Sequence, residues 1–173
     1  MEDIVKFKED ESIKGVIIRI NSPGGSTSPS PEIFEEVKKL RGKKKVYVSM
    51  GTVCASGGYY IAAAGEKIYA MPSTITGSIG VIMEQVVIEV LLKKIGLKPN
   101  TIKAGNFKDV GSPFRMMNAE ERKYFQEILD TIHVQFINTV AAERKIPMKE
   151  AVKLSDGRIY LGQQAKDLKL IDA

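Results

Sequence analysis

The fold is decided by the stretch Gly15-Val16-Ile17-Ile18-Arg19-Ile20, which runs directly into Asn21-Ser22-Pro23-Gly24-Gly25-Ser26. The first six residues form a nearly continuous β-branched run, which predicts a strand buried on both faces of a sheet. Proline and glycine then end the strand in a loop. Doubly buried strands belong to parallel sheets that helices cover on both sides, so this stretch favours an α/β fold.

Strand-like and helix-like segments alternate along the rest of the chain. The predicted helices cover residues 1–11, 31–40, 55–64 and 86–95, a long segment after the Asn118/Glu121 capping box, and 148–154. The other predicted strands cover residues 46–50, which end in a turn at Gly51, 67–70, 79–83 and 101–103, and a final piece spans 160–170. This alternation predicts a mostly parallel sheet with right-handed βαβ crossovers, in a single domain over residues 1–173.

Composition excludes several classes of protein. The chain has 26 basic and 21 acidic residues and is 43% hydrophobic, which is typical of globular domains and not of disordered, collagen-like or coiled-coil chains. Its single cysteine and single histidine exclude an intrachain disulfide, a cysteine-based zinc site and a multi-histidine metal centre. We therefore expect no metal and no cofactor.

Two segments need an interpretation of their own. The basic stretch 41–45 has no aromatic or glycine-rich RNA-binding signature beside it, so we interpret it as a solvated turn and expect no nucleic-acid partner. Residues 46–65 carry no charge over about the length that a bilayer requires. Glycines and serines interrupt that run, so we interpret it as a buried strand followed by a small-residue helix.

The first candidate for chemistry is Ser56, in Ala55-Ser56-Gly57-Gly58. A serine between a strand and the first turn of a helix has its hydroxyl beside unpaired backbone N–H groups, and neighbouring glycines let a substrate approach closely. That arrangement suits a nucleophile that attacks a carbonyl group. An isolated Ser-Gly-Gly is more often an ordinary helix cap, so this motif does not decide the matter alone.

The second candidate is the loop with Gly24 and Gly25, at the end of the first predicted strand. Ligands of open α/β sheets bind outside the carboxyl ends of the strands, and a Gly-Gly pair there can direct a backbone N–H at an oxyanion. A plain Pro-Gly turn is the alternative interpretation.

A nucleophilic serine requires a base. The one histidine, His133, falls inside the long predicted helix beside its apolar stripe, where packing is the better interpretation. A lysine can serve only when neutral, and lowering its pKa from about 10.4 to roughly 7–8 costs about 3–4 kcal/mol. Lys108 follows Phe107 in a glycine-rich loop after a predicted strand, although Asp109 lies beside it.

Together these motifs match a known family. The sequence resembles the catalytic domain of signal peptide peptidase A (SppA), a family of Ser–Lys peptidases with the Clp-protease/crotonase-like fold. The resemblance covers nearly the whole chain and rests on several motifs in a fixed order: Arg19–Gly25, Ala55–Tyr60, Thr74–Gly80, Gly105–Asp109, Asp156–Tyr160 and Gly162–Ala165. It implies that Ser56 is the nucleophile, that Lys108 is the general base, and that the backbone N–H groups of Gly25 and Gly57 form the oxyanion hole.

The resemblance implies further properties. Thr76 and Ser78 would lie in a loop on the substrate side, and the substrates would be remnant signal peptides and small or unfolded hydrophobic chains. Family members form dome-shaped homo-oligomeric rings. They also begin with a membrane anchor and at least one strand ahead of the first predicted helix, which place the catalytic domain on the extracytoplasmic side of the membrane. We expect both segments to be missing here, so that this chain alone is soluble and has an uncovered sheet edge.

Three alternatives stay open at this level. Crotonase-type hydratases and isomerases share the fold but generally use carboxylates. Another SppA-related peptidase, such as a phage head-maturation protease, is a closer alternative. A non-catalytic scaffold relative would keep the fold without activity.

Overall fold

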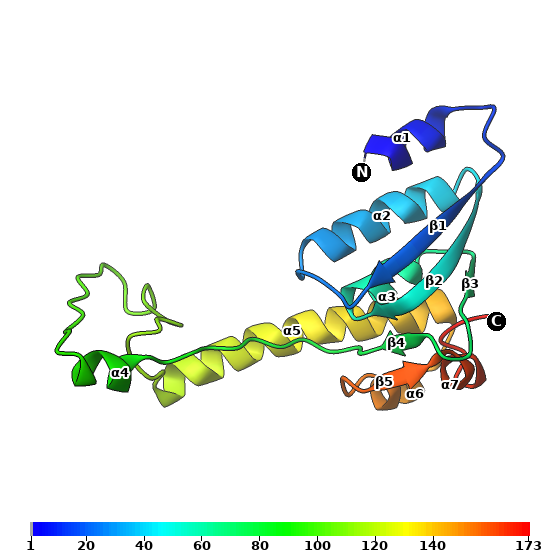
Figure 1. Ribbon diagram of the computed structural model, residues 1–173. Helices are drawn as coiled ribbons and strands as arrows, with labels where there is room; N and C mark the ends of the chain where they lie inside the picture. The colour runs from blue at the N-terminus through cyan, green and yellow to red at the C-terminus, as the bar shows by residue number, and fades with distance from the viewer. Residues whose placement is uncertain (1) are drawn as a thin grey trace. The chain divides into compact units, whose positions relative to one another are not determined.

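The computed structural model describes residues 2–173 (Figure 1). Its elements are, in order, α1 (Glu2–Glu9), β1 (Gly15–Ser22), α2 (Pro29–Arg41), β2 (Lys45–Ala55), α3 (Gly57–Ala62), β3 (Lys67–Tyr69), β4 (Ile75–Gly77), α4 (Glu89–Lys94), α5 (Ala119–Arg144), α6 (Met148–Leu154), β5 (Ile159–Leu161) and α7 (Gly162–Asp167). The contacts group the chain into two compact units: unit 1 contains residues up to 81 and from 132 onward, and unit 2 contains residues 82–131.

Unit 1 contains a five-stranded sheet built around the long strand β2. The strand order is β1-β2-β4-β5, and β3 pairs with β2 beside its first half. Every pairing is parallel except that of β4 with the short β5. This topology confirms the predicted α/β class and the mostly parallel sheet. The pairing also brings Ser22 and Thr76 into register with Cys54, so the ends of β1, β2 and β4 meet just before Ser56.

The first strand is less buried than its sequence predicts. Ile20 is buried, but the Ile17 side chain is 72% exposed, and β1 pairs only with β2 among residues 2–173. The prediction of a strand buried on both faces is therefore wrong. A β-branched run stabilises an extended backbone on an edge strand as well as on a central one.

The second strand continues through Gly51 to Ala55, where a turn was predicted. The Asn21 side chain packs against Gly51, and its Oδ1 accepts a hydrogen bond from Val53 N at 3.1 Å. A Cβ at Gly51 would lie 2.7 Å from the Cβ of Asn21. The glycine marks a close approach within the strand rather than a turn.

The remaining predictions have mixed outcomes. The helices α2, α3, α5 and α6 and the strand β3 are confirmed, with bounds shifted by a few residues at some ends. The capping box is confirmed as well, because Asn118 Oδ1 accepts from Glu121 N at 2.8 Å and a Glu121 carboxylate oxygen accepts from Asn118 N at 3.0 Å. Residues 79–83 and 101–103 are not strands. The strand β4 lies at residues 75–77 instead, just before the first of these two segments. The helix predicted at 86–95 is confined to α4, and the final piece divides into β5 and α7.

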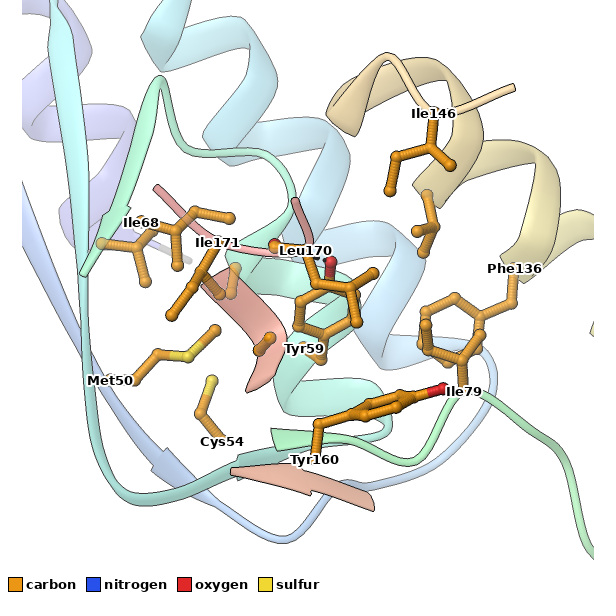
Figure 2. Close-up of a cluster of buried hydrophobic side chains, with 14 of the residues drawn as sticks. Met50, Cys54, Tyr59, Ile68, Ile79, Phe136, Ile146, Tyr160, Leu170 and Ile171 are labelled. Atoms are coloured by element: carbon orange, nitrogen blue, oxygen red, sulfur yellow. Dashed lines mark hydrogen bonds between the residues drawn. The ribbon is translucent and has the colours of Figure 1, made fainter. Parts of the chain in front are cut away.

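The core of unit 1 surrounds Tyr59 (Figure 2). Side chains from β2, α5 and β5 and from the C-terminal end meet there, among them Met50, Phe136, Tyr160 and Leu170. The fully buried Tyr59 hydroxyl donates to the Leu170 carbonyl at 2.8 Å, so its one polar atom is satisfied. This packing anchors α3, the helix that follows Ser56, in a rigid interior.

Unit 2 has a different character. Among its residues 82–131, only Glu121 is buried. Large apolar side chains stay exposed over the unit, including Ile82, Val86, Val90 and Ile102. No helix among residues 2–173 has both the length and the apolar character that crossing a membrane requires.

Candidate active site

Ser56 occupies a strained turn between β2 and α3. Its backbone angles are φ 50° and ψ −123°, a region that residues other than glycine rarely adopt. Such a conformation costs about 1–3 kcal/mol and persists only where the surroundings impose it. Here the Ser56 N–H donates to Gly77 O at 2.8 Å, and the Ser56 carbonyl accepts from Tyr60 N at 2.9 Å. A serine raised on a strained strand-to-helix turn is how several hydrolases expose their nucleophile.

The loop after β1 packs directly against this serine. Gly24 has φ 133°, and a Cβ placed on it would lie 2.8 Å from Ser56 Cβ and 3.2 Å from Ser56 Oγ. The Ser22 hydroxyl holds the loop in place, because its Oγ accepts from Gly24 N at 3.2 Å. A side chain at position 24 would therefore collide with Ser56, and only glycine lets the loop approach the Ser56 hydroxyl group this closely.

Two backbone N–H groups beside Ser56 are free. A Cβ placed on Gly57 would lie 3.1 Å from Gly25 N, so the two glycines are immediate neighbours in space. Neither the Gly25 nor the Gly57 N–H finds an acceptor among residues 2–173. Both residues line the same pocket as Ser56. The structure therefore brings three of the predicted site residues together.

The pocket beside Ser56 is mainly apolar. Tyr60, Phe136, Ile132 and Val81 supply apolar surface to its lining, and Gln135 supplies an amide. The Tyr60 ring is fixed between Phe34 and Phe136, at centroid distances of 5.3 Å and 4.8 Å. These surroundings suit an apolar side chain next to a carbonyl that Ser56 could attack.

The predicted substrate-side residues lie on the segment that supports Ser56. Thr76, in β4, is fully buried, and its Oγ1 donates to the Cys54 carbonyl at 2.7 Å. Ser78 has φ 51°, and its N–H donates to Arg158 O at 2.8 Å. Thr76 thus ties β4 to the end of β2, next to the Gly77 carbonyl that holds the turn. A contact of Thr76 or Ser78 with substrate stays a prediction.

Lys108 belongs to unit 2, where it lies on an exposed loop. Successive turns shape that loop, with Lys108 N donating to Gly105 O and Val110 N to Phe107 O, both at 3.2 Å. The Phe107 ring packs on Tyr124 of α5 at a centroid distance of 5.2 Å. Among residues 2–173, the Lys108 ammonium has no hydrogen-bond or ion-pair partner. The pairing of Lys108 with Ser56 stays a prediction.

Asp109 is engaged by cations other than its neighbour Lys108. Its carboxylate accepts from Arg115 Nε at 2.9 Å and from the Lys103 ammonium. Hydrogen bonds from Arg115 and then from Lys103 hold the pKa of the Asp109 carboxyl well below its usual range. Arg115 also binds both carboxylate oxygens of Glu121, and lowers the pKa of Glu121 to about 2. The network joins the Lys108 loop to the start of α5 and leaves the Lys108 amine without a partner among residues 2–173.

The other reactive side chains are less suitable for catalysis. The Cys54 thiol is buried, and burial raises its pKa to about 12, so it is almost wholly protonated near neutral pH. His133 is half-buried, and its Nε2 has no hydrogen-bond partner within residues 2–173. His133 is not among the residues that line the pocket beside Ser56.

The family model described as "Peptidase family S49" matches residues 38–173. The chain belongs to peptidase family S49. This membership confirms the predicted resemblance to the SppA family.

Several relatives in this family align with almost the whole chain. The "Putative protease slr0021" of Synechocystis is 42% identical over 97% of the chain and 61% of its own length. The "Putative signal peptide peptidase SppA" of Enterococcus faecium is 39% identical over 99% of the chain and 50% of its own length. The "Serine protease SPPA, chloroplastic" of Arabidopsis thaliana is 36% identical over 100% of the chain and 26% of its own length. The chain thus spans less than two thirds of each of these S49 relatives.

Two features of the candidate site were not predicted from the sequence. Gly24 was interpreted together with Gly25 as part of a turn, but any Cβ at position 24 would collide with the Ser56 side chain. Ser30, at the start of α2, lines the pocket and was not singled out. The Gly-Gly pair after the first strand was a signal that could have identified Gly24. Ser30 offered no such signal, because a serine at a helix start resembles an ordinary capping residue.

Proposed function

We propose that this chain is the catalytic domain of a serine endopeptidase with a Ser56–Lys108 dyad and the Clp-protease/crotonase-like fold. The backbone of Ser56 is the observation that supports this most strongly. A residue held at φ 50° and ψ −123°, beside two unpaired N–H groups and an apolar pocket, has the geometry of an acyl-transfer nucleophile.

In the proposed mechanism, the neutral amine of Lys108 takes the proton of Ser56 Oγ as that oxygen attacks the peptide carbonyl. A C–O bond forms, and the carbonyl electron pair moves onto its oxygen. The N–H groups of Gly25 and Gly57 then stabilise this oxyanion, and losing one such donor costs about 3–4 kcal/mol in comparable hydrolases. Collapse of the intermediate breaks the C–N bond, and the leaving amine takes the proton from Lys108.

The acyl-enzyme is then hydrolysed by water. Lys108 removes a proton from the attacking water, the same two N–H groups stabilise the second oxyanion, and Ser56 Oγ leaves with the returned proton. Each cycle consumes one water and restores the dyad. No metal or cofactor enters this mechanism.

We propose hydrophobic peptides, including remnants of signal peptides, as the substrates. The aromatic and aliphatic lining of the pocket next to Ser56 supports this choice. Such remnants arise at membranes, so the same proposal includes an anchor that places the intact protein there, on the extracytoplasmic side.

A panel of matched peptides tests the proposed function. We expect the chain to cleave peptides with an apolar residue before the scissile bond at least about 10-fold faster than those with a charged residue there, because a charge would be desolvated among Tyr60, Phe136 and Ile132. Initial rates measured by mass spectrometry give the ratio. Equal rates, or faster cleavage beside charged residues, would rule out this substrate class.

We also propose that the protein assembles with copies of itself through unit 2. Only Glu121 is buried among residues 82–131, while large apolar side chains such as Ile102 and Val86 are 93% and 73% exposed. Several large, exposed apolar side chains on a unit that has almost no buried residues are typical of a protein–protein interface. A homo-oligomeric ring would cover it.

Sedimentation velocity tests this assembly. We expect the unmodified chain to sediment as an oligomer, and Ile102→Asp to shift it toward the monomer, because an unpaired charge would be buried in the interface. The exposed Lys94→Asp, in the same unit, is the control for charge alone. A monomer at all concentrations, or no difference between the two variants, would contradict assembly through this surface.

A further inference from the structure

The Ser30 side chain lies at the junction of the two proposed oxyanion donors. Ser30 is the second residue of α2, and it is only 6% exposed. A Cβ placed on Gly57 would collide with Ser30 Oγ and would lie 3.3 Å from Ser30 Cβ and 3.1 Å from Gly25 N. The Ser30 hydroxyl therefore packs into the space that the missing Gly57 side chain leaves open.

The same hydroxyl also holds the Gly25 loop. Ser30 Oγ donates to the Ser26 carbonyl at 3.1 Å. Ser26 directly follows Gly25, so this hydrogen bond holds the chain two peptide groups after the N–H that would donate to the oxyanion. Residues 25–28 are otherwise exposed and form no regular element.

The helix that presents Ser30 packs against the core. One turn further along α2, Phe34 is 3% exposed and packs edge-on against Tyr60 at a centroid distance of 5.3 Å. The Tyr60 hydroxyl in turn forms a hydrogen bond with Thr139 Oγ1 at 2.9 Å. Ser30 thus connects an exposed loop to a fixed part of the core.

We propose that Ser30 is a positioning residue, which sets the spacing between the Gly25 and Gly57 N–H groups through its contact with Gly57 and its hydrogen bond to Ser26. This inference rests on the proposed function. Ser30 does not itself touch the reacting atoms. Its removal frees the loop, and a donor displaced by about 1 Å loses much of its stabilisation of the transition state.

The test compares Ser30→Ala with Ser28→Ala. Ser28 precedes the same helix, is exposed, and its side chain makes no capping hydrogen bond, so it controls for the loss of a serine at this helix start. We expect Ser30→Ala to lower kcat about 10- to 100-fold while KM changes less than about 2-fold. Ser30→Thr, which keeps the hydroxyl, is expected to recover most of kcat, and Ser28→Ala to match the unmodified protein.

A second readout separates positioning from general loosening. A peptide aldehyde forms a hemiacetal with the nucleophilic serine, and its oxygen occupies the oxyanion position, whereas the matching peptide alcohol binds without that oxygen. Ser30→Ala is expected to weaken binding of the aldehyde by the same factor by which it lowers kcat/KM. Binding of the alcohol is expected to stay unchanged. Thermal unfolding of each variant confirms that the protein compared is folded.

Two outcomes overturn the inference. One is a folded Ser30→Ala with the kcat of Ser28→Ala; the other is equal weakening of the aldehyde and the alcohol. If Ser56→Ala is inactive in the same assay, only the role of Ser30 fails. If Ser56→Ala keeps full activity, the proposed function fails, whatever Ser30→Ala does.

Discussion

Ser56→Ala is expected to lower kcat/KM for hydrophobic peptides by about 10⁴-fold or more, with KM nearly unchanged. The substitution removes the Oγ that forms the acyl bond, while the pocket and the two glycine N–H groups remain. Alanine has the same difficulty as serine at φ 50° and ψ −123°, so the loss would not come from a relaxed backbone. The measurement is steady-state hydrolysis of a fluorogenic peptide.

A matched serine controls for this result. Ser73 lies exposed in the turn between β3 and β4, and it has no side-chain hydrogen bond among residues 2–173. Ser73→Ala is expected to retain full activity. Hydrolysis by Ser56→Ala at more than about a tenth of the unmodified rate would mean that another group is the nucleophile.

Replacement of Lys108 has the second largest expected effect. Lys108→Ala is expected to lower kcat about 10³- to 10⁴-fold, because a serine hydroxyl without a base is a weak nucleophile. Lys108→Arg separates the two roles that a lysine can have. A guanidinium keeps the positive charge but cannot give up its proton near neutral pH, so Lys108→Arg is expected to be as inactive as Lys108→Ala.

The controls for Lys108 lie in the same unit. Lys94, exposed at the end of α4, makes no ion pair among residues 2–173, and Lys94→Ala is expected to be fully active. Full activity in Lys108→Arg would show that the side chain serves as a cation rather than as a base.

The fold class was predictable because alternating segments determine it, but the depth of burial was not. The run from Gly15 to Ile20 has no polar residue except Arg19, so the sequence alone does not distinguish an edge strand from a central one. Residues 101–103 fit a strand by composition. Ile102 is instead 93% exposed, and residues 101–103 belong to no strand of the sheet that residues 2–173 form.

The position of Ser56 between the end of a strand and the start of a helix was predictable from the sequence, but the geometry found there was not. Ser56 and the glycines after it are candidates because they come directly after a predicted strand. The strained backbone of Ser56, in contrast, depends on the Gly77 carbonyl, which lies on another strand. The engagement of Asp109 by Arg115 is equally invisible in sequence, where Asp109 is merely the neighbour of Lys108. Hydrogen bonds of this kind exist only in the folded chain.

Covalent labelling determines whether Ser56 is an activated nucleophile. The unmodified chain is incubated with a fluorophosphonate and analysed by intact mass and by peptide mapping. We expect one adduct per chain, located on Ser56, and no adduct on Ser56→Ala. A stoichiometric adduct on a different residue, or a chain that hydrolyses peptides and still labels equally when Ser56 is alanine, would contradict it.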